Sequence, residues 1–152
     1  MKISNLDRFK AKLAALPKVA KDEMRKAVAD SAEEIVDLQK RLAPVDDGDL
    51  QMSIKWRWGN EKREAYSQDF GSISGSHELS ARIFAGDSKV RYAHLVEFGA
   101  APHIAGGKFE GAQHPGSPKQ PFFYPGWRTG KKRAKSRISR AITKAAKRVA
   151  AE

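Results

Sequence analysis

Two stretches of apolar residues at helical spacing occupy the first 43 residues, and Pro17 separates them. Pro17 should end or kink the first stretch, because proline lacks the backbone donor that a helix needs. Pro44 ends the second stretch and also disfavours helical geometry at Ala43. We therefore expect helix over residues 5–43, following an N-cap at Asn5, with a long amphipathic helix from about 19 to 43. The apolar positions are Leu6, Phe9, Leu13 and Leu16, then Met24, Val28, Ile35, Leu38 and Leu42.

Strict alternation of apolar and polar residues follows at positions 53–58. This period of two is typical of a strand with one buried face, since successive side chains point to opposite sides. The expected buried face holds Ile54, Trp56 and Trp58, and the expected polar face holds Lys55 and Arg57.

The middle of the chain is harder to assign. Residues 59–80 are polar and too long for a plain connection, which indicates an arm or a hairpin extension. Residues 81–85 form a second strand candidate. Residues 90–98 fit two structures. A strand would place Val90, Tyr92, Val96 and Phe98 on one face, whereas a short helix would stack Tyr92 on Val96 and Leu95 on Phe98.

The last third combines a loop, an aromatic cluster and a helix. Residues 99–120 are rich in Gly, Pro and His, which predicts a loop. The aromatic residues 122–124 lie between two prolines and are expected to anchor an irregular segment to the core; stacking on nucleic-acid bases is the alternative. The final helix is expected over 131–150. Its narrow apolar stripe consists of Ala134, Ile138, Ala141, Ile142, Ala145 and Val149.

Composition limits the class of protein. The 152 residues are 40% hydrophobic and carry a formal net charge of +11, which fits one domain, 1–152, with a modest core. No apolar run approaches the length of a membrane-spanning helix, and no signal sequence is recognisable at the start. We expect synthesis in the cytoplasm without export. The absence of cysteine excludes disulfides and thiolate metal sites.

The positive charge is concentrated at the end of the chain, where three interpretations are open. The basic residues could contact phosphates or lie on an anionic membrane, although an apolar face made mostly of alanine binds lipid weakly. The helix could instead dock its apolar stripe on the core or on a neighbouring subunit, which we favour because Ile138 and Ile142 need burial. The basic residues are Arg128, Lys131, Lys132, Arg133, Lys135, Arg137, Arg140, Lys144, Lys147 and Arg148.

No arrangement of side chains predicts a catalytic or cofactor site. His94 and Glu97 are three residues apart but lack the second histidine of a zinc-protease helix. His103 and His114 share a loop that could fold over, which leaves zinc open as an alternative. The acidic residues Asp46, Asp47 and Asp49 suit a turn better than a calcium loop, since the ligand spacing fails. We expect no enzyme, no cofactor and no metal.

Three segments in this order resemble a known family. They are Ala43-Pro44-Val45-Asp46-Asp47-Gly48-Asp49-Leu50-Gln51-Met52-Ser53-Ile54, then Tyr92-Ala93-His94-Leu95-Val96-Glu97-Phe98-Gly99-Ala100, then Gln120-Pro121-Phe122-Phe123-Tyr124-Pro125. Together they resemble the tail-component (neck, tail-completion or tail-terminator) family of lambda-like long-tailed bacteriophages. Asp47 and Ala100 stand where the family usually has threonine, and the loop over 101–119 is longer than is typical.

The resemblance implies an α+β fold, with a small, mostly antiparallel sheet packed with a long N-terminal helix and a C-terminal helix. It implies structural roles for the motif residues. Leu50 and Ile54 fix the helix-to-strand junction, Tyr92, Val96 and Phe98 pack in the core, Gly99 permits a turn, and Phe122 ties down the last loop. A buried Glu97 would need a partner, for which a basic residue of the same or the next subunit is expected.

The resemblance also implies a non-enzymatic virion assembly protein of a phage or prophage, assembled in the host cytoplasm. Its expected place is a ring, commonly a hexamer, at the head–tail joint or the top of the tail, against head-completion and tail-tube proteins. Residues 59–80 and 101–119 are the candidate arms. The alternative is a basic nucleic-acid-binding protein that uses the final helix. The residues expected to contact a polyanion or a partner are Lys131, Lys132, Arg133, Lys135, Arg137, Arg140 and Lys144.

Overall fold

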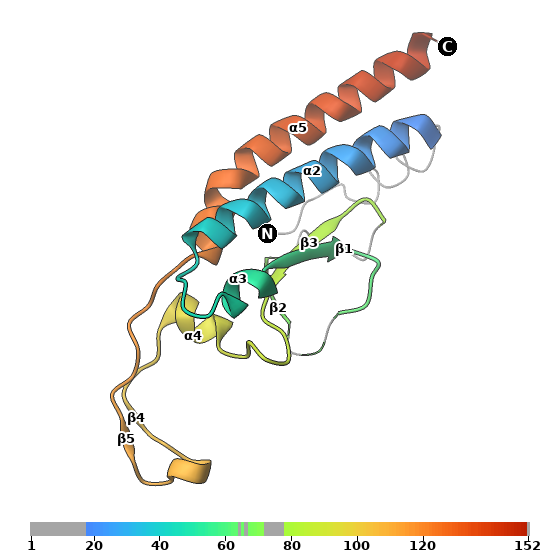
Figure 1. Cartoon of the computed structure of the whole chain (residues 1–152). Coiled ribbons are helices and arrows are strands. Elements are labelled where there is room, and N and C mark those ends of the chain that lie inside the picture. The colour runs from blue at the N-terminus through green and yellow to red at the C-terminus, as the bar shows by residue number, and fades with distance from the viewer. Residues whose placement is uncertain (1–17, 64, 66, 72–77, 152) are drawn as a thin grey trace.

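Two long antiparallel helices, α2 and α5, lie side by side over a small three-stranded sheet, and a thin β-hairpin projects from the opposite end of the molecule (Figure 1). The computed structural model describes residues 18–63, 65, 67–71 and 78–151. This arrangement confirms the expected α+β class. The elements are α2 (Lys18–Leu42), α3 (Asp49–Ser53), β1 (Lys55–Trp58), β2 (Gln68–Gly71), β3 (Ala81–Ala85), α4 (Ala93–Phe98), β4 (His103–Ile104), the 3₁₀ turn η1 (Gly107–Phe109), β5 (Gln113–His114) and α5 (Phe123–Ala151).

Helix α2 ends at Leu42, two residues before Pro44. It buries Met24, Val28 and Ile35 of the predicted apolar stripe, but Leu42, in the last turn, is 44% exposed. Its buried positions recur at spacings of three and four, which places one face against α5 and the sheet. The earlier stripe of Leu6, Phe9, Leu13 and Leu16 lies outside the described residues. The buried side chains of α2 include Met24, Val28, Ala32, Ile35, Val36 and Gln39.

Glycines on α5 allow the two long helices to approach closely. A Cβ atom added at Gly126 would lie 2.5 Å from Gln39 Cγ, and one added at Gly130 would lie 2.5 Å from Ile35 Cγ1. The two glycines are four residues apart and therefore share one face of α5. The fully buried Gln39 also donates from Nε2 to the carbonyl of Phe123, at 3.0 Å.

The sheet has the strand order β1–β3–β2 and both pairs are antiparallel. Its α2-facing side carries Trp56 opposite Ile83 and Trp58 opposite Ala81. The two tryptophan rings meet edge to face at 5.0 Å. Trp58 also stacks under the guanidinium of Arg25, 4.3 Å above its ring. These contacts join the sheet to α2.

The second face of the sheet is less polar than alternation predicted. Arg57 is only 6% exposed and its guanidinium lies 4.5 Å from the ring centroid of Phe84, which is buried. Its Nη1 donates to Ser67 Oγ at 3.4 Å. The prediction of a solvent-facing Arg57 was wrong, because the buried Phe84 beside it on β3 offers a ring against which the guanidinium packs.

Helix α5 begins at Phe123 rather than at residue 131, so Phe123 and Tyr124 belong to a helix and not to an irregular segment. The expected anchoring to the core is confirmed for Phe122 and Phe123, which are buried. The predicted start at residue 131 was wrong, because Pro125 is tolerated in the first turn of the helix, where no intrahelical donor is needed. Ala134 and Ile138 pack against the core clusters and Ala145 is buried, whereas the side chain of Val149 lies outside the described residues.

Of the two structures that fitted residues 90–98, a strand and a short helix, the helix is the one that forms, over residues 93–98. No helix in the described part of the chain is long and apolar enough to span a membrane.

The close helix contact gives a stability test. We expect Gly126→Ala to lower the free energy of unfolding by about 1–3 kcal/mol, since the added methyl overlaps Gln39 and its backbone. Helix propensity alone predicts the opposite sign, a gain of up to about 1 kcal/mol. Urea denaturation followed by circular dichroism measures the difference. Ser139→Ala, on the exposed side of α5, is the control and should change stability little. A stabilised Gly126→Ala protein would contradict the close contact.

Candidate functional site

The most distinctive polar feature of the structure is the carboxylate of Glu97, which holds the start of α5. Glu97 is 3% exposed. Its Oε2 accepts hydrogen bonds from the backbone N–H groups of Phe122 and Phe123 at 2.7 and 2.8 Å, and its Oε1 accepts one from Tyr124 at 3.0 Å. One side chain of α4 therefore caps a helix that begins 26 residues later in the sequence.

This arrangement explains how a charge can be buried with no ion pair to another described residue. The first N–H groups of a helix have no intrahelical acceptor, and they carry the positive end of the helix dipole. The Glu97 carboxylate meets both needs at once. Within the described part of this chain, three backbone donors take the role that was expected of a basic residue.

Gly99 closes α4 and brings the base of the projecting hairpin against it. Its φ is +76°, and a Cβ here would lie 2.9 Å from the carbonyl oxygen of Ser117 and 3.0 Å from the backbone nitrogen of Lys119. Only glycine fits both the conformation and the space. Beside it, Ala100 and Ser117 exchange backbone hydrogen bonds at 3.0 and 2.9 Å, and Gln120 N–H donates to the carbonyl of Val96 at 2.8 Å.

The arm, defined as residues 101–119, is a thin hairpin with almost no buried side chain. Strands β4 and β5 pair His103 with His114 and Ile104 with Gln113. Ile104 and Phe109 are 72% and 73% exposed. Such exposure of large apolar side chains on a projection is typical of a surface that another molecule covers.

The two arm histidines stack at 4.9 Å but do not form a convincing metal pair. His103 Nδ1 lies 2.9 Å from the carbonyl of Ala101 and must donate to it. His114 Nδ1 accepts from the N–H of Gly116 at 3.0 Å, so its other nitrogen carries the proton in the neutral ring. Only His103 then presents a free lone pair outward.

The motif residues occupy different environments. Leu50, Ile54 and Phe122 are buried, at 5%, 0% and 0% exposure, while Val96 is partly buried against the core. The expectation that Tyr92 and Phe98 pack in the core was wrong, since they are 44% and 59% exposed. Helix α4 is short and turns Ala93 and Glu97 inward, which leaves Phe98 outside against the ring of Tyr124, 6.0 Å away.

The acidic turn before α3 lies near Tyr92. Partial burial raises the pKa of the Tyr92 hydroxyl, and the negative charges of Asp49, Asp47 and Asp46 raise it further. Val45 and Met52, beside this turn, are 67% and 64% exposed. The turn therefore contributes an acidic and partly apolar surface rather than a buried acid–base site.

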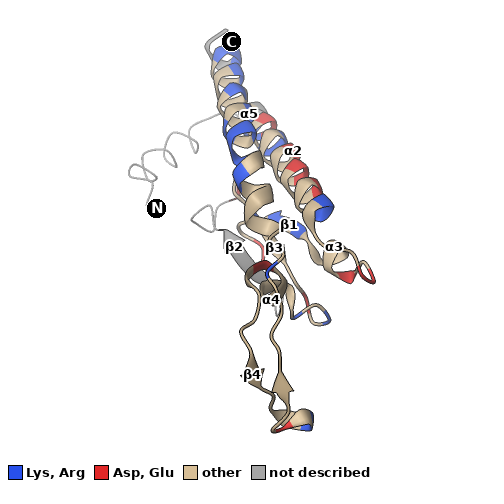
Figure 2. Ribbon diagram, turned by 90° about the vertical axis from the view of Figure 1, so that its left-hand side faces the viewer, with Lys and Arg blue, Asp and Glu red and all other residues tan. Residues whose placement is uncertain are grey.

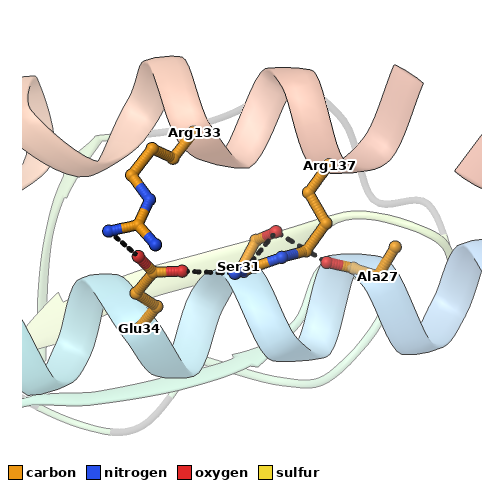
Figure 3. A network of polar contacts seen from close by, with 5 residues as sticks. All are labelled: Ala27, Ser31, Glu34, Arg133 and Arg137. Atoms are coloured by element: carbon orange, nitrogen blue, oxygen red, sulfur yellow. Dashed lines mark hydrogen bonds and ion pairs between the residues drawn. The ribbon is translucent and has the colours of Figure 1, made fainter. Parts of the chain in front are cut away.

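Part of the basic charge of α5 is neutralised within the chain. Glu34 of α2 pairs with Arg133 at 2.9 Å and with Arg137 at 2.5 Å, and Arg137 also donates to Ser31 Oγ at 3.4 Å (Figure 3). Further along, Glu23 pairs with Lys144 at 3.7 Å and with Arg148. Three of the predicted contact residues, Arg133, Arg137 and Lys144, thus join α5 to α2.

Six basic residues of α5 have no ion pair within the described part of the chain, and four of them gather on one face of the helix. We define the basic stripe as four exposed residues of α5 that have no ion pair within the described part of the chain. Their spacing of three and four places them on one face of the helix. Arg140, also exposed, donates from Nε to the carbonyl of Ser136 at 3.3 Å. The stripe consists of Arg128, Lys131, Lys132 and Lys135.

Removing the charge of Glu97 tests the cap. Glu97→Gln keeps the shape but replaces one acceptor with a donor, so we expect it to lower the free energy of unfolding by about 2–4 kcal/mol. Urea denaturation measures this loss. Glu110→Gln, on the exposed arm, is the matched control. Equal stability of the two variants would contradict the role assigned to Glu97.

Comparison with known proteins shows that the sequence matches one family. The family described as bacteriophage HK97-gp10, a tail component, matches residues 7–99, which is more than half of the chain. The matched span includes α2, the sheet and the Glu97–Gly99 end of α4. No curated protein and no solved structure matches the chain. The chain therefore belongs to the HK97-gp10-like family of bacteriophage tail components, structural proteins of the virion that contact other virion proteins.

Proposed function

We propose that this protein forms a closed ring at the head–tail joint or the top of the tail, as a neck, tail-completion or tail-terminator subunit without enzymatic activity. Its neighbours would be further copies of itself, commonly six to a ring in the resembling family, together with head-completion and tail-tube proteins. Family membership supports a tail role. The observation that carries the ring proposal is the projecting arm.

The arm has the properties of an assembly element. It holds two large exposed apolar side chains, Ile104 and Phe109, and has no core of its own to bury them. Its base is nevertheless fixed to the body by Gly99 and the Ala100–Ser117 bonds. A fixed base positions the tip accurately, which reduces the entropy lost when the tip meets a partner.

The second candidate arm, residues 59–80, is partly sheet. Strand β2 pairs with β3, so its residues 68–71 extend the sheet. Residues 72–77 lie outside the described part of the chain. The arm over 101–119 therefore carries the proposal alone.

Replacing the arm's apolar side chains tests this function. We expect Ile104→Ser with Phe109→Ser to abolish ring formation and incorporation into particles, while the thermal stability of the monomer stays unchanged because both residues are exposed. Ile104→Val with Phe109→Leu is the conservative control. Light scattering, electron microscopy and protein analysis of purified particles supply the measurements. Absence of the wild-type protein from particles would contradict the proposal.

Contact with a polyanion is the second candidate, and the basic stripe supports it. Four unpaired cations within two helical turns could lie along a DNA backbone. If so, Lys131→Gln with Lys132→Gln should weaken DNA binding and flatten its salt dependence by about two ion equivalents. Fluorescence anisotropy across salt concentrations measures both. Lys147→Gln, off the stripe, is the control. A wild-type chain whose DNA affinity does not depend on salt would contradict this function.

A further inference from the structure

The outer face of α2 carries a negatively charged counterpart of the basic stripe. We define the acidic stripe as three exposed residues of α2 at spacings of three and four, which share one face of that helix. The acids that face α5 are different ones, Glu23 and Glu34. Figure 2 shows acidic residues (red) along α2, beside an α5 that carries Lys and Arg (blue) among uncharged residues. The stripe consists of Asp30, Glu33 and Asp37.

Neither stripe is neutralised within the described part of the chain. Asp30 and Asp37 have no ion pair there, and Glu33 accepts a hydrogen bond from Trp56 Nε1 at 2.6 Å but meets no cation. The inner edges of the same two helices are paired by Glu23 and Glu34. Charge is thus matched between the helices and left unmatched on their outer faces.

The two stripes lie at the same level along the helix pair. Gly126 is against Gln39 and Gly130 is against Ile35, so each step forward on α5 corresponds to one step back on α2. Continuing this correspondence places Arg128 level with Asp37, Lys132 level with Glu33 and Lys135 level with Asp30.

The flanking residues obey the same correspondence. Lys26 and Arg41 lie on the outer face of α2, at either end of the acidic stripe. The α5 residues level with them are Ser139 and Tyr124, which are uncharged. A second helix pair set alongside the first would therefore bring opposite charges together and would not place these two cations against others.

We infer that the basic stripe on α5 of one copy packs against the acidic stripe on α2 of a second copy. This inference rests on the proposed ring and names the surface between its subunits. The contact is head to tail, because one copy offers α5 and the next offers α2. Stripes at equal height require no shift along the helix axes from copy to copy. A ring needs a contact without such a shift, because a shift repeated from copy to copy gives a helical filament.

Charge reversal tests the pairing. Arg128→Glu with Lys135→Glu makes the α5 stripe less basic, and Asp30→Lys with Asp37→Lys makes the α2 stripe basic. Each double variant alone should need a concentration at least about tenfold higher to associate, since the pairs that fix orientation become repulsive. An equimolar mixture of the two should associate again, and so should one chain with all four changes. Light scattering and electron microscopy give the mass and form of each assembly.

The controls separate this contact from general charge and from folding. Lys147→Glu and Asp47→Lys change exposed residues outside both stripes and outside the arm, and should leave association unchanged. All the changed residues are exposed, so thermal melting should match the wild type. Double variants that form wild-type rings would overturn the stripe contact and leave the ring proposal standing. A wild-type chain that never oligomerises, in solution or in particles, would overturn both.

An engineered disulfide tests directly which residues meet across the contact. The chain has no cysteine, so Asp37→Cys with Arg128→Cys adds the only two thiols. Mild oxidation of assembled protein should produce a ladder of dimers and higher multiples on a non-reducing gel. Asp37→Cys with Lys147→Cys is the control and should remain monomeric on the gel. A missing ladder for the first pair would overturn the inference.

Discussion

The bond between the Glu97 carboxylate and the first backbone amides of α5 determines how the molecule is put together. It joins α4 to α5, the longest helix in the described part of the chain. The same contact sets the direction of α5 along α2. In the sequence, the arm lies between Glu97 and the start of α5. A buried carboxylate without these donors would be costly, so helix and acid each depend on the other.

The contact between α2 and α5 extends that constraint along the whole length of the helices. Gly126 and Gly130 allow close approach near the cap, and the ion pairs of Glu34 and Glu23 follow further on. The mode of packing therefore changes from steric fit to charge pairing along one helix. Partly exposed ion pairs contribute little stability each. Their value here is to fix which face of α5 turns toward α2.

Periodicity predicted the elements well where the pattern was long. The helix ending before Pro44 and the α+β class followed from apolar spacing and the family resemblance. Alternation predicted a strand over 53–58, of which 55–58 form β1, whereas Ser53 ends the short helix α3, which no pattern predicted. Periodicity predicted least where a side chain binds backbone atoms, because backbone groups leave no mark in the sequence. Nothing in the sequence marks the amides that Glu97 binds, and the proline at 125 hid the first turn of α5. The pair Gly126 and Gly130 was a missed signal, since two glycines four apart on a helix indicate close packing.

The geometry at Gly99 has an evolutionary consequence. Because the two strands of the arm leave and rejoin the body side by side, at Ala100 and Ser117, everything between them is a self-contained excursion. Lengthening such an excursion costs little, since loop entropy grows only slowly with length. Relatives can therefore exchange or extend the arm and meet a different neighbour while the capped helix pair stays the same. Replacement of the arm alone would then change which protein the chain contacts, while the rest of the fold stays the same.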